Sequence, residues 1–178
     1  MDWSSAVHVT ALYSLIASGL FCAVLIGGAA IAPDSLEHDY PPAIRDRFRA
    51  EHGGKSVRGA RTSTAMGVLI ALLLGTTPVV ALTGLHQEQG SDLGFWPGFG
   101  FGTALFAWIN LVDLLIVDWW LFCTLRPAFF TLPGTGGMPE YRDKAFHWRV
   151  LVPLPLLMIP GYGVLVGLGT LAVEALTG

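Results

Sequence analysis

The stretch Phe95–Leu125, FWPGFGFGTALFAWINLVDLLIVDWWLFCTL, decides the fold of this chain. It contains no Lys or Arg, and its only charged residues are Asp113 and Asp118. A helix needs about 20 predominantly apolar residues to cross the hydrocarbon core of a bilayer. This stretch is longer than that, so it predicts a transmembrane helix that carries two carboxylates inside an apolar span.

Three further stretches of the 178-residue chain have the same character, namely Val7–Ala32, Ser63–Leu85 and Val150–Val173. The composition agrees, because 53% of the residues are hydrophobic and only 13% are charged, against about 25% charged in a typical globular protein. We therefore predict an all-α polytopic membrane protein. Residues 1–178 should form a single domain, a bundle of four transmembrane helices.

The first apolar stretch is expected to be a retained helix and not a cleaved signal peptide. A signal peptide begins with a positively charged segment followed by a short apolar core. The first five residues, MDWSS, include no Lys or Arg, and the apolar stretch that follows them is too long.

The basic residues fall into two segments, Arg45–Arg61 and Arg126–Arg149, which together hold all 10 Lys and Arg of the chain. Short loops rich in Lys and Arg remain in the cytoplasm. We therefore expect a protein of the cell (inner) membrane with both termini extracytoplasmic and both long loops cytoplasmic. Short interfacial helices are predicted at Ala43–Ala50 and Pro139–Arg149. The expected partners are the lipid bilayer and anionic headgroups at these basic loops, and not nucleic acid.

Small residues recur at four-residue spacing in the predicted helices. They are Gly19, Ala23 and Gly27 in the first, Ser63, Gly67, Ala71 and Gly75 in the second, Gly94, Gly98 and Gly102 in the third, and Gly163 and Gly167 in the fourth. In lipid, close approach over small residues supplies the attraction between helices. The pattern predicts a tightly packed bundle and also a homo-oligomer or a partner membrane subunit.

The polar residues of the third span, Asn110, Asp113 and Asp118, are the main candidate site. With Arg126 at the inner interface, Asp118 lies about 12 Å and Asp113 about 20 Å inside the membrane. An aspartate at mid-membrane costs about 2.5–3.5 kcal/mol, so Asp113 should be neutral or exchange a proton near neutral pH unless a cation partners it. We predict Asp113 and Asp118 as catalytic or proton-binding residues and Asn110 as a ligand-binding residue. The alternative is a structural role in hydrogen bonding between helices.

On an α-helix the two aspartates would stand about 140° apart, so we expect their carboxyl groups not to converge. Trp119 and Trp120 adjoin Asp118, and Trp108 lies in the same span. An acid beside aromatic faces can bind an organic cation or shelter a carbocation, which makes the three tryptophans candidate ligand-binding residues. An ordinary aromatic belt at the membrane interface is the alternative.

A candidate metal site lies in the two basic loops. Its residues are Asp34 and His38 in the first loop and Glu140, Asp143 and His147 in the second. On helices, these three- and four-residue spacings put each set on one face, and the two sets could meet over a divalent metal such as Fe, Mn or Zn. Salt bridges to the many basic residues nearby are the alternative. The cofactor, if there is one, is otherwise unknown from the sequence.

The remaining histidines and both cysteines carry no recognisable motif. We interpret His8, His52 and His86 as isolated surface or interface residues. Cys22 and Cys123 lie toward the reducing, cytoplasmic side and lack a CxxC spacing, which predicts buried apolar thiols without a disulfide.

Three functions remain, because no nucleophile elbow and no phosphate-binding loop is present. The favoured one is a small proton- or cation-coupled transporter or channel that works as a homo-oligomer around the carboxylate site. The second is a membrane-embedded enzyme for a lipid or isoprenoid-like substrate, with Asp113 or Asp118 as general acid and a pocket lined by Trp and Phe. The third is a non-catalytic subunit of a membrane complex. The sequence leaves open whether the protein is an enzyme.

Overall fold

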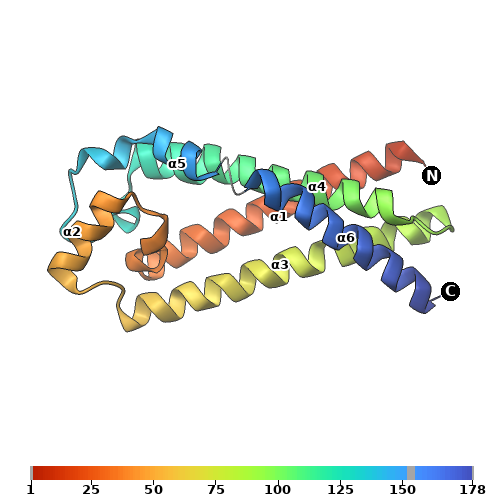
Figure 1. The fold of residues 1–178 in the computed structure, drawn as a ribbon, viewed down its shortest axis with the longest axis horizontal. Coiled ribbons are helices and arrows are strands. Elements are labelled where there is room, and N and C mark those ends of the chain that lie inside the picture. Colours follow the sequence, from red (N-terminus) through yellow and green to blue (C-terminus); the bar gives the residue numbers. More distant parts are fainter. Residues whose placement is uncertain (1, 152–154, 178) are drawn as a thin grey trace. The chain divides into compact units, whose positions relative to one another are not determined.

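A computed structural model of the chain describes residues 2–151 and 155–177, and its regular elements are all helices (Figure 1). In chain order they are α1 (Trp3–Ile31), η1 (Pro33–Asp39), α2 (Pro42–His52), α3 (Val57–Gln89), α4 (Phe95–Val112), η2 (Asp113–Leu125), η3 (Ala128–Phe130), η4 (Pro139–Arg142), α5 (Lys144–Leu151) and α6 (Pro155–Thr177). The predicted all-α class is confirmed.

In the described part of the chain, four helical stretches are long and apolar enough to cross a membrane. They are Trp3–Ile31, Val57–Gln89, Phe95–Leu125 and Pro155–Leu176. They overlap the four predicted spans, although the second begins earlier than Ser63 because its helix starts within the basic segment. Residues 152–154 of the fourth predicted span lie outside the described residues.

Contacts group the chain into two compact units. Unit 1 comprises Met1–Leu20, Leu72–Leu111 and Val152–Gly178, and unit 2 comprises Phe21–Ala71 and Val112–Leu151. All of the Lys and Arg residues belong to unit 2, and the sequence of unit 1 has none. The two units therefore offer very different electrostatic surroundings to any acidic side chain that they contain.

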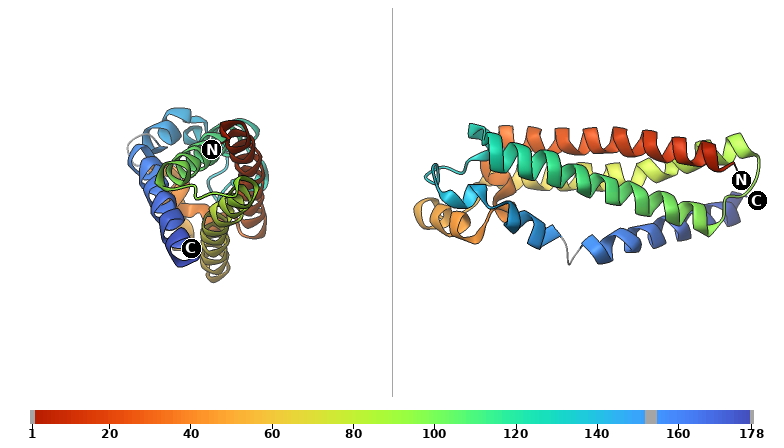
Figure 2. Two further views of the ribbon diagram at one scale, coloured as in Figure 1. Left: turned by 90° about the vertical axis from the view of Figure 1, so that its right-hand side faces the viewer. Right: turned by 90° about the horizontal axis from the view of Figure 1, so that it is seen from above.

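Within unit 1, α6 lies alongside α4, as Figure 2 shows. Glycines make this approach possible. A Cβ added to Gly98 would lie 3.1 Å from the Cα of Gly167, and one added to Gly102 would lie 2.8 Å from the Cβ of Val166. Both distances are shorter than ordinary van der Waals contact, so the small residues of the third and fourth predicted helices pack directly against each other.

Replacing Gly98 with alanine should lower the stability of the protein by about 1–3 kcal/mol, because the added methyl group overpacks this contact. Gly100 on the same helix is the matched control, since a Cβ there would meet nothing within 4 Å. Gly100→Ala should leave stability unchanged or raise it by about 0.5–1 kcal/mol through helix propensity. Thermal unfolding followed by circular dichroism measures both. Equal effects of the two substitutions would contradict the packing.

The core of unit 2 is built from the two segments that the sequence suggested were loops. Tyr40 packs edge-on against Phe122 at 5.0 Å and against Tyr141 at 6.0 Å between ring centroids. The predicted helix at Ala43–Ala50 is present as α2, and its apolar residues Ile44 and Phe48 are buried in this core. The other predicted helix, Pro139–Arg149, is split into the 3₁₀ turn η4 and α5.

Candidate functional site

The segment Asp113–Leu125, which continues α4, is a π-helix. In a π-helix each hydrogen bond joins residue i to residue i+5, and such segments are rare and are frequently found at functional sites. The pattern is visible at the end of η2, where the backbone N–H of Arg126 donates to the carbonyl of Leu121 at 2.7 Å. Arg126 has a left-handed backbone with φ of 48° and ends the helix.

The π-helical hydrogen bonding changes which residues share a face. Asp118 is five residues from both Asp113 and Cys123, so in a π-helix it lies one turn from each of them and on nearly the same side of η2. The expectation that the two aspartates point about 140° apart is therefore wrong, because it assumed α-helical geometry. Their carboxyl groups are close enough to act on each other electrostatically.

Helix α5 lies beside η2 (Figure 1), and its residue His147 contacts Asp118 on this side of η2. Its Nδ1 lies 3.2 Å from Oδ1 of Asp118, and the two side chains are 5% and 17% exposed. The imidazole ring packs edge-on against Phe122, with 4.9 Å between centroids. Burial lowers the pKa of His147, but the hydrogen bond with Asp118, the Cys123 thiol and the Asp118 charge outweigh it and raise the pKa to about 9. The imidazole is thus a cation paired with a carboxylate at neutral pH.

The charge of this pair also acts electrostatically on two further carboxyl groups. One is Asp113, and the other is Asp39 at the end of η1. Part of the Asp39 side chain reaches the surface, yet the protein atoms packed around it raise its pKa, and the charge of Asp118 adds to this effect. We call Asp39, Asp113, Asp118 and His147 the Asp–His cluster. It holds three carboxyl groups for a single imidazole.

Two buried polar atoms of the Asp–His cluster have no hydrogen-bond partner among the described residues. They are Oδ1 of Asp113 and Nε2 of His147. Buried polar groups in folded proteins are nearly always paired, and an unpaired one calls for a specific explanation. Oδ1 of Asp113 is an open position for a proton or a cation, whereas Nε2 of the protonated His147 could only donate a hydrogen bond to a substrate group.

Two buried tyrosines pack beside the cluster in different ways. The hydroxyl of Tyr141 accepts a hydrogen bond from the backbone N–H of Leu132 at 3.0 Å and shares another with Thr135 at 2.7 Å. The hydroxyl of Tyr40 is buried without a partner in the described ranges. Burial raises the pKa of both phenols, so both stay neutral.

Tyr40 and Tyr141 allow a matched test of how a buried hydroxyl affects protein stability. Tyr141→Phe should destabilise the protein by about 1–3 kcal/mol, because it leaves the buried backbone N–H of Leu132 without its acceptor and removes one of the two hydrogen bonds of the Thr135 hydroxyl. Tyr40→Phe removes a hydroxyl that bonds nothing, so stability should stay the same or rise. Chemical or thermal unfolding of both variants measures the difference, and a Tyr40→Phe variant as unstable as Tyr141→Phe would show that the Tyr40 hydroxyl has a partner after all.

The other predicted residues of the third span have varied surroundings. Asn110, which belongs to unit 1, donates from Nδ2 to the carbonyl of Phe106 in its own helix at 2.7 Å. Trp119 donates from Nε1 to the carbonyl of Lys144 at 3.3 Å and thereby ties α5 to η2. Trp108 and Trp120 are 44% and 52% exposed. Of the three tryptophans, Trp119 is the one held beside the Asp–His cluster.

The five predicted metal ligands have separate surroundings. Asp34 is buried and accepts a hydrogen bond from the backbone N–H of Ser56 at 2.6 Å, and Asp143 pairs with Arg149 at 3.3 Å. His147 pairs with Asp118 as described above, Glu140 keeps a buried Oε2 without a partner in the described chain, and His38 is exposed.

Within the described residues, the metal-type side chains that do converge are His86, Asp92 and Glu174 in unit 1. The expectation that His86 is isolated is therefore wrong. Asp92 follows His86 closely in the link after α3, whereas Glu174 comes from a distant segment whose proximity no local spacing reveals.

No protein-family model, no curated protein and no solved structure matches the chain, so its function is inferred from its own residues.

Proposed function

We propose that this chain is an inner-membrane protein whose four long helices span the bilayer, with both termini extracytoplasmic. Many large apolar side chains on these helices are exposed, for example Leu72, Leu157 and Leu165 at 57%, 74% and 68%. Such a surface is unfavourable in water and favourable in lipid. The confinement of Lys and Arg to unit 2 supports a cytoplasmic position for its loops, where exposed residues such as Arg47 would meet anionic headgroups.

In this membrane protein the Asp–His cluster binds a proton or a small cation, and the chain works as a proton- or cation-coupled transporter or channel. The observation that carries this proposal is the buried Oδ1 of Asp113, which accepts no hydrogen bond in the described chain although a second carboxyl group lies nearby. Leaving a buried polar group unsatisfied costs about 1–3 kcal/mol. A proton or cation supplied from the cytoplasmic side would remove that cost.

A homo-oligomer would complete the conducting path, since four helices are few for one. Gly98 and Gly102 of α4 and Gly163 and Gly167 of α6 already pack against each other's helices within the chain. By contrast, a Cβ at Gly19 or Gly27 on α1, or at Gly67 or Gly75 on α3, would meet nothing within 4 Å. These faces are open to the close helix contacts that drive association in lipid. Association with a different membrane subunit is the other use of the same faces.

Flux measured in liposomes tests this function. Wild-type protein with a pH gradient or a monovalent cation gradient across the vesicle should dissipate it faster than empty vesicles, and Asp113→Asn should return the rate to the empty-vesicle level. Asp46→Asn is the matched control, because Asp46 is an exposed aspartate on α2. Wild-type rates equal to those of empty vesicles, or full flux in Asp113→Asn, would contradict the proposal.

The second candidate is a membrane-embedded enzyme for a lipid or isoprenoid-like substrate. Cys123 and Asp118 both raise the pKa of His147, so a thiol, an imidazole and a carboxyl group lie close together, and these are group types that covalent catalysis uses. Native mass spectrometry of the purified protein separates the two candidates. An apolar molecule that co-purifies with wild type and is lost in Cys123→Ser or Asp118→Asn would favour the enzyme.

A further inference from the structure

We propose that His86, Asp92 and Glu174 form a binding site for a divalent transition-metal ion in unit 1, apart from the Asp–His cluster. One ligand atom from each residue lies within 4.8 Å of the other two. Two ligands bonded at about 2.1 Å to the same ion can be no more than about 4.2 Å apart. Small rotations of the side chains therefore bring all three atoms to bonding distance.

The local fold explains the convergence. His86 lies in the last turn of α3, and Glu174 lies near the end of α6. The link between α3 and α4 contains Gly90 and Gly94, whose φ values of 62° and 74° are left-handed and favour glycine. These two glycines allow the tight turns that return Asp92 to the end of α3.

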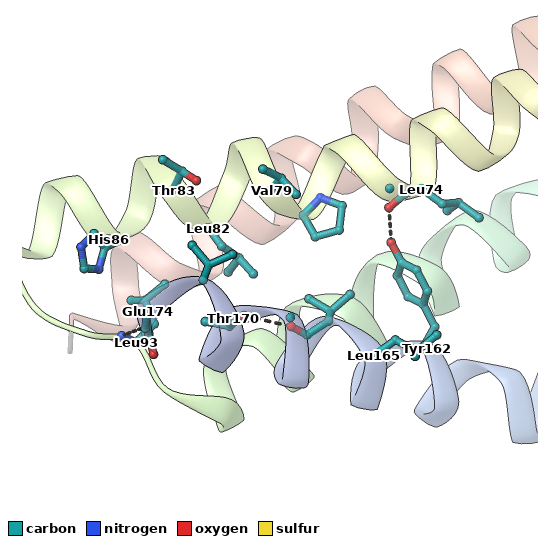
Figure 3. Close-up of a pocket in the computed structure, with 15 residues that line it drawn as sticks. Leu74, Val79, Leu82, Thr83, His86, Leu93, Tyr162, Leu165, Thr170 and Glu174 are labelled. Atoms are coloured by element: carbon teal, nitrogen blue, oxygen red, sulfur yellow. Dashed lines mark hydrogen bonds between the residues drawn. The ribbon is translucent and has the colours of Figure 1, made fainter. Parts of the chain in front are cut away.

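The Glu174 carboxylate is already oriented. Its Oε1 accepts hydrogen bonds from the backbone N–H groups of Leu93 at 2.7 Å and Gly94 at 3.1 Å. Figure 3 shows His86, Leu93 and Glu174 together at one end of the pocket that lies between α3 and α6. A carboxylate has about four lone-pair positions, and hydrogen bonds of this kind position the ligands in known metal sites.

His86 supplies the second observation. Its Nδ1 is buried and has no hydrogen-bond partner in the part of the chain that is described. A histidine with an unpartnered imidazole nitrogen, beside two carboxyl groups, is a ready metal ligand, and imidazole with carboxylate suits Zn, Fe or Mn better than Ca or Mg.

The charge of unit 1 favours a cation at this site. Its acidic residues are Asp2, Glu88, Asp92 and Glu174, and its sequence has no Lys or Arg. The metal set predicted in the basic loops lies in unit 2, which holds all of the Lys and Arg and where Asp143 pairs with Arg149. A divalent ion at the site in unit 1 is therefore not repelled by basic side chains of that unit.

The pocket beside the site indicates which kind of ligand a bound ion would meet. Its volume is about 470 Å³, and it is lined by both His86 and Glu174 together with apolar residues such as Leu82 and Leu165. Three protein ligands are typical of catalytic zinc sites, which keep a further position open, whereas structural sites have four. The open position would face an apolar ligand in this pocket.

Zinc titration of purified, tag-free protein in detergent tests the site. Isothermal titration calorimetry should show one Zn²⁺ per chain, with affinity reduced about 100-fold or more in His86→Ala. Glu88→Gln is the matched control, because Glu88 is an exposed acid in the same last turn of α3 and lies outside the group. It should bind zinc like wild type.

If His86→Ala fails to fold, the Asp92→Asn variant still tests whether the site binds zinc. Asp92 is exposed in a link, so the substitution should leave unfolding in the absence of metal unchanged and still weaken zinc binding. Zinc should raise the thermal midpoint of wild type, because an ion that binds only the folded state stabilises it. Absence of zinc binding by wild type, or equal affinity in His86→Ala or Asp92→Asn, would overturn the proposal, whatever the flux measurements show.

Discussion

Replacing Asp118 with asparagine should lower the pKa of His147 from about 9 to about its ordinary value of 6.5 or below. The substitution removes the hydrogen-bonded charge that raises the pKa, whereas the burial that lowers it remains. Nitrogen-15 NMR titration of the imidazole measures the change directly. A His147 pKa that stays near 9 in the variant would show that other groups hold the proton.

The same pair should make stability depend on pH. Because the folded-state pKa of His147 is raised, its contribution is fully present below about pH 6.5 and is lost as the pH rises through about 9. A shift of this size corresponds to on the order of 3 kcal/mol. The wild-type thermal midpoint should therefore fall across this interval, and the midpoint of Asp118→Asn should be nearly constant.

The control for this experiment is an ion pair on the surface. Arg47 and Glu51 pair on α2, with their side chains 59% and 33% exposed. Such pairs contribute about 0–1 kcal/mol, so Glu51→Gln should follow the wild-type pH profile. A wild-type profile that is flat between pH 6.5 and 9 would contradict the buried pair.

Replacing Asp113 with leucine should stabilise the protein and abolish its flux. Leucine removes a buried carboxyl oxygen that accepts no hydrogen bond in the described chain, so the expected gain is about 1–3 kcal/mol. Flux should fall to the level of empty vesicles because the cation-binding group is gone. Thermal unfolding and the liposome assay on the same preparation measure both quantities.

Asp46→Leu on the exposed surface of α2 is the control, and it should change neither stability by more than about 0.5 kcal/mol nor flux. If Asp113→Leu is strongly destabilised, the carboxyl group has a structural partner. The alternative of a helix-tying hydrogen bond would then be correct.

The helical class and the four long apolar spans were predictable from the sequence. They follow from length and composition alone, since each span exceeds the roughly 20 residues that a bilayer needs. The helix α2 was also predictable, because Ile44 and Phe48 share a face at four-residue spacing. The single-domain organisation and the membrane orientation remain predictions.

The geometry of the site was harder to predict. The sequence already shows a five-residue spacing between Asp113, Asp118 and Cys123, which suits a π-helix. Because the α-helix is so much commoner, we assumed α-helical geometry, in which the side chains of Asp113 and Asp118 point in different directions. The pairing of Asp118 with His147 depends on how α5 docks on η2, and the approach of Glu174 to His86 depends on how α6 docks on α3. Contacts between segments far apart in the chain produce no periodic pattern in the sequence, so the sequence does not predict them.

Labelling with dicyclohexylcarbodiimide tests most directly whether Asp113 is a buried carboxyl group that exchanges a proton. This apolar reagent enters membranes and reacts with protonated carboxyl groups, and peptide mass spectrometry locates the adduct. We expect an adduct on Asp113 that decreases as the pH rises and is absent in Asp113→Asn, while the exposed Asp46 stays unlabelled. An Asp113 that is unlabelled at every pH, or labelled to the same extent at all of them, would contradict the proposed site.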